Sequence, residues 1–188
     1  MFRKRKALPV DKMIKLEDWI DSNINETDLC ECDTGSKMSK TLKLKVEHVN
    51  AGELSKNIEA ILAPIDDDNF FGVIRVCDEN SHKSFSYMHE IMHYLYDVGR
   101  GQRVTRVFER QKKKKVNDDH EQDIDYLAAS SIMKYREIKK HIRDYDSSSP
   151  KMDELAFIEG LCAKFNQERI AVIRRIREVR KVMQVRDI

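Results

Sequence analysis

The sequence predicts an α+β fold in which helices outnumber a small set of strands. Apolar residues recur at helical spacing over most of the second half of the chain. Two short stretches in the first half have the pattern of strands instead. The 188 residues suffice for one domain with a sizeable core, together with a small appendage.

The composition is that of an ordinary water-soluble protein. Charged residues make up 36% of the chain and hydrophobic residues 40%, with a formal net charge of +2. No stretch has the apolar length that a membrane-spanning helix needs, and the basic start MFRKRKALPV lacks the apolar core of a signal peptide. The cysteines are scattered, at Cys30, Cys32, Cys77 and Cys162. We therefore expect a cytoplasmic protein with reduced thiols.

Local patterns define each element of the first half. Apolar residues at helical spacing predict a helix over residues 10–24, with Asp11 as its N-cap. Alternation in TLKLKVEHV predicts a strand over 41–49 with one face in water. A short helix is expected over 53–62, ended by Pro64, and FFGVIRV predicts a strand over 70–76.

The second half is predicted to be helical. A helix over 83–97 is followed by a polar, lysine-rich connection over 99–120 and a long helix over 121–142. Ser149 and Pro150 break the chain and favour a new helix start. Two further helices, over 152–165 and 168–183, form a C-terminal helical pair. We therefore divide the chain into residues 1–148 and a pair, 149–188, packed on them.

The pentapeptide HEIMH, within the helix over 83–97, has the pattern of a metal site. His89 and His93 are four residues apart, so they share one helix face and can offer nitrogens to one ion. Glu90 lies about 100° round the helix, where a base could hold a metal-bound water. A buried histidine pair satisfied by hydrogen bonds would show the same spacing. A helix that is apolar nearly all round is buried, and its polar groups need partners.

The helix expected over 121–142 offers candidates for the third ligand that a catalytic zinc site needs. Glu121 lies near its inward face, and small residues at Ala128 and Ala129 let another helix approach closely. Asp125, one turn on, could accept the free ring N–H of a ligating histidine. Asp123 and His120 are the fallback ligands. Acidic residues are also common at helix starts without any metal.

The two segments together resemble the ImmA/IrrE-type metallopeptidases. SFSYMHEIMHYLY is similar to the active-site helix of that family, whose pattern is F-T-x-A-H-E-x-x-H. EQDIDYLAASSIM is similar to the second motif of the family, E-x-E-A-N-x-F-A-A-x-L-L-M-P. Glu121 and Asp123 fall on the two glutamates and Asp125 on the asparagine. Ile124 and Lys134 depart from the usual alanine and proline.

This resemblance implies a mostly helical, zincin-like domain with a small sheet, and it implies the roles of the site residues. His89 and His93 would bind zinc with Glu121 as third ligand, and Glu90 would be the catalytic base. The family implies a cytoplasmic zinc endopeptidase. Its substrate would be a helix-turn-helix repressor, whose cleavage derepresses a mobile genetic element or a stress regulon.

Two other functions stay open at this point. One is a DNA-binding regulator that keeps a zincin-like domain as a structural module, and the other is a non-proteolytic binding protein with a degenerate site. An intact H-E-x-x-H favours the peptidase, because a structural zinc site has no need of Glu90. The residue that stabilises the oxyanion is not defined by the sequence, although Tyr87, Tyr126 and Tyr135 are candidates.

Two basic segments are candidate contact surfaces. The run from Arg110 to Lys115 is interpreted as a solvated loop, because so short a charge run carries little specificity. The last helix carries Arg174, Arg177 and Lys181 beside an apolar row. This basic face could dock an acidic partner or read DNA. We expect docking of the substrate, and we do not expect direct DNA binding.

Overall fold

A computed structural model describes residues 8–24, 34–50, 52–55, 58–77, 83–111, 119–150 and 153–187. The chain forms two compact units: Ile24–Ala128, called here the sheet unit, and Met1–Asn23 with Ala129–Ile188, called the helical unit. Helices outnumber strands in the described residues, which confirms the predicted α+β class. The predicted division after residue 148 stays a prediction. Cys30, Cys32 and Lys112–Lys115 lie outside the described residues.

The sheet unit contains a four-stranded mixed sheet in its described residues. Its strands are β1 (Leu44–Val49), β2 (Ile58–Ala63), β3 (Gly72–Cys77) and β4 (Phe108–Gln111), in the order β1-β3-β2-β4. β1 runs parallel to β3, whereas β2 pairs antiparallel with both β3 and β4. β3 is therefore a central strand, and five of its six residues are buried. β4 lies at the edge.

Gly72 allows a close approach at the start of β3. A Cβ atom at this position would lie 2.5 Å from Cγ2 of Val104, which is far inside van der Waals contact. The loop before β4 can therefore pack against β3 only because residue 72 has no side chain. Val104 is buried there, and its N–H donates to the carbonyl of Phe71 at 2.8 Å.

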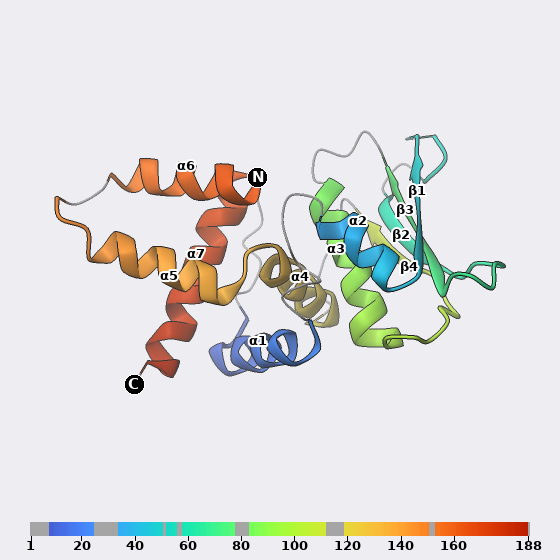
Figure 1. Ribbon diagram of the computed structural model, residues 1–188, viewed down its shortest axis with the longest axis horizontal. Helices are drawn as coiled ribbons and strands as arrows, with labels where there is room; N and C mark the ends of the chain where they lie inside the picture. Colours follow the sequence, from blue (N-terminus) through green and yellow to red (C-terminus); the bar gives the residue numbers. More distant parts are fainter. Residues whose placement is uncertain are drawn as a thin grey trace. The chain divides into compact units, whose positions relative to one another are not determined.

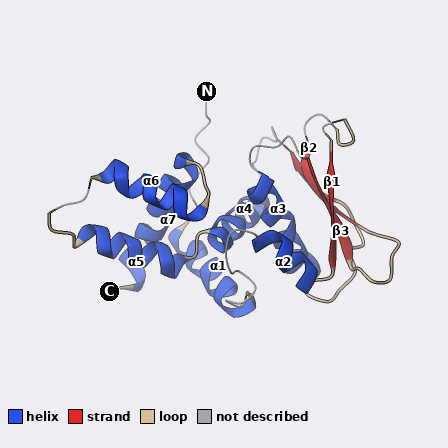
Figure 2. Cartoon of the chain, turned by 45° about the horizontal axis from the view of Figure 1, so that its top comes forward, coloured by secondary structure: helices blue, strands red, loops and turns tan. Residues whose placement is uncertain are grey.

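Helices α2 (Thr34–Thr41) and α3 (Lys83–His93) lie on one side of the sheet (Figures 1 and 2). α3 contacts β2, β3 and β4 and continues into a π-helical turn, Tyr94–Val98. Every residue from Ser86 to Leu95 is buried, as the apolar pattern around this helix predicts. α4 (Asp119–Ile132) follows β4 in the chain, and its residues up to Ala128 belong to the same unit.

Three predictions for the sheet unit are corrected by the structure. Residues 58–62, predicted as the end of a short helix, form β2, because Ile58, Ala60 and Leu62 alternate and pair with strands on both sides. The short apolar run fits either period, and sheet pairing decides between them. The connection predicted over 99–120 contains β4, and α2 was not predicted. The strands predicted over 41–49 and 70–76 are confirmed as β1 and β3.

The helical unit consists of the end of α4 and of α1 (Val10–Asn23), α5 (Tyr135–Asp146), α6 (Glu154–Phe165) and α7 (Arg169–Arg186). α7 contacts α1, α5 and α6, so it is the centre of this unit, and the predicted pairing of the last two helices is confirmed. Asp11 lies within the first turn of α1 and is not its cap. α6 starts later than predicted, where the Asp153 side chain accepts from the N–H of Ala156.

The long helix predicted over 121–142 is two helices, α4 and α5. The guanidinium of Arg175 donates to the carbonyl of Met133 at 2.9 Å, and Lys134 is extended with ψ near 138°. A carbonyl used in this way has lost its place in the helical ladder, so the helix ends there. The sequence pattern continues through the break because both helices are amphipathic.

A buried ion pair lies at the centre of the helical unit. Arg175 is 1% exposed and donates to Glu17, which is 2% exposed, at 2.8 Å. The hydroxyl of Ser130 donates to the same carboxylate oxygen at 3.0 Å. This network joins α7 to α1 and to the end of α4.

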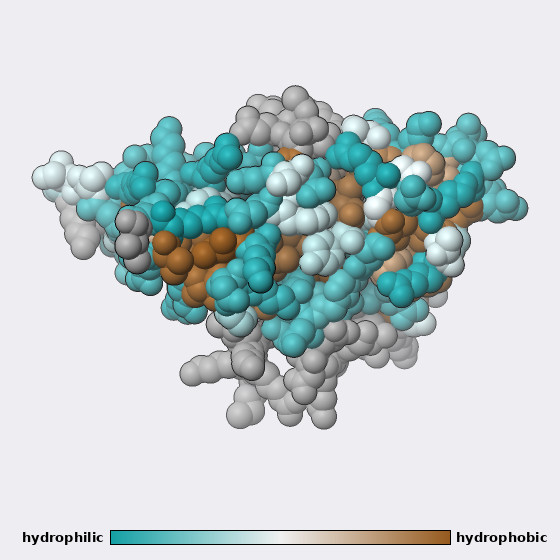
Figure 3. Space-filling view, turned by 90° about the horizontal axis from the view of Figure 1, so that it is seen from below, coloured by the Kyte–Doolittle hydropathy of each residue, from teal (hydrophilic) through white to brown (hydrophobic). Residues whose placement is uncertain are grey.

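The face of the molecule seen in Figure 3 consists mostly of hydrophilic residues. No helix among the described residues is long and apolar enough to span a membrane.

Candidate metal centre

The two histidines of α3 converge on one point. His89 and His93 are 1% and 2% exposed, and their Nε2 atoms are 3.1 Å apart. The two residues are about one helical turn apart, so their rings lie close together on one face of α3. The rings meet edge to face, with their centroids 4.8 Å apart. Two ring nitrogens so close together need a proton or a cation between them. The predicted convergence of these side chains is therefore present.

Glu121, in the first turn of α4, is the third member of this group. Its carboxylate oxygens lie 3.3 Å from Nε2 of His89 and 3.5 Å from Nε2 of His93. Glu121 is only partly buried, which leaves one side of the group accessible. His89, His93 and Glu121 form one of two groups of ligand-type atoms that the described residues bring within 4.8 Å of one another.

The spacing of these three donors fits a tetrahedral metal ion. A zinc ion with bonds of about 2.0–2.1 Å places neighbouring donor atoms about 3.3–3.4 Å apart. The two Nε2 atoms are 3.1 Å apart, and each lies close to one oxygen of Glu121, at 3.3 Å for His89 and 3.5 Å for His93, so these distances are near that value. Two imidazoles and one carboxylate are also a common donor set for catalytic zinc, which keeps its fourth position for water. The residues present therefore fit a zinc ion in both chemistry and spacing.

A carboxylate lies behind each histidine. Nδ1 of His89 is 3.0 Å from Asp125, as predicted, and Nδ1 of His93 is 2.7 Å from Asp97. Because a carboxylate only accepts, each Nδ1 carries the proton and each Nε2 lone pair faces the group. Such carboxylates orient the rings of metal-binding histidines. The structure thus presents Nε2 of both histidines as the atom that would bind a metal, once any proton on it is displaced.

Asp97 was not predicted. It lies four residues after His93 in the π-helical turn, so the spacing rule that pairs His89 with His93 could also have found it. Asp97 contacts a second partner as well, since Nε2 of His120 is 2.9 Å from its other oxygen. His93, Asp97 and His120 form the second group of ligand-type atoms. Direct hydrogen bonds join its members, so His120 supports the centre through Asp97.

Electrostatics in this region favour a cation. Burial favours a neutral His93, but its hydrogen bonds with Asp97 and Glu121 and the nearby charge of Glu90 raise its pKa to about 9. Burial also acts to raise the pKa of Glu121, but hydrogen bonds with both histidines hold that pKa far below its usual range. Asp97 likewise has a lowered pKa, because its histidine partners outweigh its burial. The negative surroundings therefore stabilise a proton or a metal ion.

The remaining candidates are placed as follows. Glu90 is fully buried on α3, next to His89, and its charge acts on His93. Asp123 is buried too, but it belongs to neither group of ligand-type atoms in the described residues. Tyr87 and Tyr126 are buried in the sheet unit, whereas Tyr135 belongs to the helical unit. The roles of these residues stay predictions.

Phe108, on the edge strand β4, borders the centre. Its ring centroid is 4.9 Å from that of His93, and the guanidinium carbon of Arg106 lies 4.7 Å above the same ring. The edge strand therefore runs directly beside a metal-ligand candidate. Asp125 and Asp97 lie behind the histidines, so the centre has a polar back and an aromatic flank.

The predicted docking residues lie on one face of α7. Arg174, Arg177 and Lys181 are exposed, and the exposed apolar residues Ile170 and Val185 continue the same stripe at helical spacing. Arg174 is paired with Glu178 at 2.9 Å, whereas Arg177 and Lys181 have no ion-pair partner among the described residues. Their predicted role in docking is not decided by this geometry.

A comparison with known families identifies the class of protein to which this chain belongs, and that class is one that the donor set of the centre fits. Residues 64–176 match the IrrE N-terminal-like domain, a peptidase family. The match spans more than half of the chain and includes His89, Glu90, His93 and Glu121, so the chain belongs to this family. The resemblance stated from the two motifs is thereby confirmed. Neither the curated proteins nor the solved structures contain a match.

Proposed function

We propose that the protein is a zinc-dependent endopeptidase with His89, His93 and Glu121 as its zinc ligands. The observation that carries this proposal is the convergence of two Nε2 atoms, 3.1 Å apart, with a carboxylate whose two oxygens lie 3.3 and 3.5 Å from them. Membership of a peptidase family supports hydrolysis of a peptide bond as the reaction. The presence of Glu90 beside His89 supports catalysis, because ion binding alone would not need it.

Each residue has a defined task in this proposal. When bound, zinc lowers the pKa of a water molecule and polarises the scissile carbonyl. Glu90 accepts the proton of the attacking water and passes it to the nitrogen of the leaving amine. Asp125 and Asp97 keep the protons on Nδ1 of the two histidines, so that both Nε2 lone pairs stay available. The buried surroundings of α3 keep bulk water away from Glu90.

The edge strand suggests how a peptide binds. In the described part of the chain β4 pairs with β2 alone, and Phe108 of β4 borders His93. An extended peptide can add to such an edge through main-chain hydrogen bonds, while side-chain pockets select its residues. We propose that the substrate lies along β4 with its scissile bond beside the metal centre. Only an extended or locally unfolded segment of a target protein can bind in this way.

We propose that the physiological substrate is a helix-turn-helix repressor in the cytoplasm, whose cleavage derepresses a mobile element or a stress regulon. Family membership supports this proposal through the resemblance described above. The exposed basic stripe of α7 supports a second contact apart from the metal centre, because clustered cations steer an acidic surface into an encounter. A protease that acts inside a cell needs such a contact for selectivity.

The test is the variant Glu90→Gln. A glutamine is nearly isosteric but cannot accept the proton of water, so we expect cleavage to slow by about 100-fold or more. Zinc content and the circular dichroism spectrum should stay at parental values. If a helix-turn-helix protein is encoded in a neighbouring reading frame, it is the substrate used in the assay. Cleavage at the parental rate by Glu90→Gln would show that Glu90 is not the base.

The same variant tests the identity of the substrate separately from the type of reaction. If the neighbouring protein is the substrate, Glu90→Gln should retain it uncut in a complex that can be isolated. If the parent protein cleaves an unstructured test protein such as casein but not this neighbour, the endopeptidase proposal stands and the repressor proposal is wrong.

A further inference from the structure

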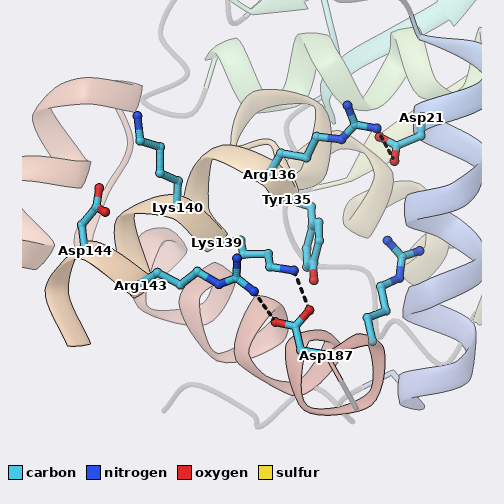
Figure 4. A pocket seen from close by; sticks show the side chains of 9 residues that line it. Asp21, Tyr135, Arg136, Lys139, Lys140, Arg143, Asp144 and Asp187 are labelled. Atoms are coloured by element: carbon cyan, nitrogen blue, oxygen red, sulfur yellow. Dashed lines mark hydrogen bonds and ion pairs between the residues drawn. The ribbon is translucent and has the colours of Figure 1, made fainter. Parts of the chain in front are cut away.

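A pocket of about 510 Å³ lies within the helical unit, apart from any residue of the metal centre. It is formed by one face of α5, the end of α7 and Asp21 of α1 (Figure 4). A volume of this size is in the range of small-molecule sites, which span about 300–1,000 Å³. Its lining is dominated by charged side chains, so the pocket suits a polar, charged ligand.

α5 contributes four cations to this pocket from a single face. Arg136, Lys139, Lys140 and Arg143 follow the spacing i, i+3, i+4, i+7, which places them on adjacent rows of the helix. Arg136 and Lys140 are four residues apart, as are Lys139 and Arg143, and like charges at that spacing destabilise a helix. The arrangement therefore costs helix stability unless anions occupy the space between the side chains.

Two of these four cations bind the carboxylate of Asp187. Its two carboxylate oxygens accept from Nζ of Lys139 at 2.6 Å and from Nη2 of Arg143 at 2.9 Å (Figure 4). Asp187 is also the C-cap of α7, where a negative charge opposes the helix dipole. The cations of the pocket therefore stabilise this carboxylate at a position where the helix dipole disfavours a negative charge. An external anion that takes its place would relieve that repulsion.

Two polar groups of the pocket are not satisfied by Asp187. Lys140 has no ion-pair partner among the described residues. Tyr135 is 7% exposed, and its buried hydroxyl has no hydrogen-bond partner in the described part of the chain. The cations of Lys139 and Arg186 lie 5.6 and 5.3 Å from the centroid of the Tyr135 ring. The floor of the pocket is thus a positively charged surface with spare donors.

We propose that this pocket binds a small molecule through a phosphoryl group, with Lys139, Lys140 and Arg143 as its main contacts. A phosphoryl dianion has three acceptor oxygens, so it can engage three cations where the carboxylate of Asp187 engages two. The lining contains five cations and three carboxylates, and Arg186 is also paired with Asp18 outside the lining, which leaves one net positive charge for an anion to neutralise. The five are Arg136, Lys139, Lys140, Arg143 and Arg186, and the three are Asp21, Asp144 and Asp187.

Calorimetric titration of the full chain with inorganic phosphate, adenosine monophosphate and adenosine tests this site. Phosphate and the monophosphate should bind saturably at one site per chain, and adenosine should not bind. Lys140→Gln and Arg143→Gln should each weaken binding by about tenfold or more, because each removes a charged donor. Asp187→Asn should strengthen binding several-fold, because it removes the internal competitor. Tighter binding of the monophosphate than of phosphate would identify an organic phosphate as the ligand.

Lys181→Gln is the matched control, since it removes one exposed cation from α7 outside the pocket. It should leave the affinity for phosphate unchanged, and an equal loss in this variant would show diffuse electrostatic attraction instead. Acetate that binds as tightly as phosphate would overturn the phosphoryl assignment. Absence of saturable binding to both the parent and Asp187→Asn would overturn the site. Binding of a DNA duplex that depends on Lys140, without binding of phosphate, would assign the face to nucleic acid.

Discussion

The geometry of the metal centre depends on two carboxylates that contact the histidines from behind. Asp125 and Asp97 accept from Nδ1 of His89 and His93 at 3.0 and 2.7 Å. We expect Asp97→Ala and Asp125→Ala each to lower the affinity for zinc by about 10–100-fold, the usual effect of losing such a partner. Competition with a chromophoric chelator measures this. Parental affinity in both variants would show that neither carboxylate orients a ligand.

Glu121 and Asp123 provide a direct comparison between two acidic residues of one helix turn. Glu121 lies within 3.3 Å of His89, whereas Asp123 is outside the group of ligand-type atoms. Glu121→Ala should therefore lose most of its zinc, and Asp123→Ala should keep close to one zinc per chain. Elemental analysis of both purified variants decides the matter. Equal zinc in the two variants would remove Glu121 from the ligand set.

The affinity for zinc should rise with pH. The pKa of His93 is raised from 6.5 to about 9, so below pH 9 a zinc ion must displace a proton. Apparent affinity should then increase by about tenfold per pH unit up to about pH 9 and level off above it. Calorimetry at pH 7.5 in two buffers with different ionisation enthalpies measures the release, expected to be close to one proton per zinc. Uptake of zinc without proton release would contradict this assignment.

The raised pKa of His93 also affects the stability of protein from which a chelator has removed the metal. This stability should fall as the pH rises. A group whose pKa is raised on folding stabilises the folded state fully below its unfolded pKa of 6.5. That contribution is lost as the pH rises towards about 9. The denaturation midpoint of the stripped protein should therefore fall over this interval, and bound zinc should remove the effect.

At the level of single residues, the sequence predicted what helix geometry alone determines. His89 with His93, and Glu121 with Asp125, are pairs four residues apart, and each pair meets on one face of its helix. The contact between Asp97 and His93 follows the same spacing, but Asp97 was not predicted, because the helix over 83–97 was interpreted only as a buried, mostly apolar helix. Residue spacing could not predict that the two helices bring these pairs together. That expectation came from the resemblance to a family.

Among the secondary-structure elements, the predictions are wrong where a contact with residues far along the chain determines the structure. The pattern around residues 53–62 suits a helix or a strand, and pairing of β2 with two strands selects the strand. The amphipathic pattern runs unbroken from α4 into α5, and at the break the carbonyl of Met133 accepts from Arg175, which is far along the chain. The break also falls where the second motif of the family has a proline and this chain has Lys134. Local propensity contains no information about such partners.

The ion pair between Arg175 and Glu17 yields a prediction about α7. Both side chains are almost completely buried, and Arg175 also holds the carbonyl of Met133. Arg175→Met leaves Glu17 as an uncompensated buried charge, so we expect a loss of about 3–5 kcal/mol in the free energy of unfolding. Urea denaturation of the stripped protein measures the change.

The neighbouring position provides the control for this prediction. Arg174 is exposed and paired with Glu178, so Arg174→Met should cost about 1 kcal/mol or less. The double variant Glu17→Leu with Arg175→Met should recover part of the loss, because no charge then stays buried alone. If Arg174→Met and Arg175→Met destabilise the protein equally, the buried pair does not organise the helical unit.

On the scale of the whole molecule, the candidate metal centre and the exposed basic faces belong to different units. The ligand candidates and the edge strand lie in the sheet unit, and the exposed basic faces of α5 and α7 lie in the helical unit. The two faces also differ from each other. The cations of α5 surround a pocket and are largely paired, whereas Arg177 and Lys181 on α7 are exposed and have no ion-pair partner among the described residues. Of these two faces, the α7 stripe is therefore the better suited to steering a large partner.

Reversing charge on the α7 stripe should separate association from bond cleavage. In the double variant Arg177→Glu and Lys181→Glu, cleavage of the intact repressor should slow by about tenfold at low salt, and by less as salt screens the attraction. Zinc content and hydrolysis of a short peptide spanning the cleavage site should be unchanged. Lys164→Glu, a reversal on α6, should have little effect on the intact repressor. If the double variant instead loses binding to promoter DNA while it cleaves the repressor normally, the stripe reads DNA and the docking proposal is wrong.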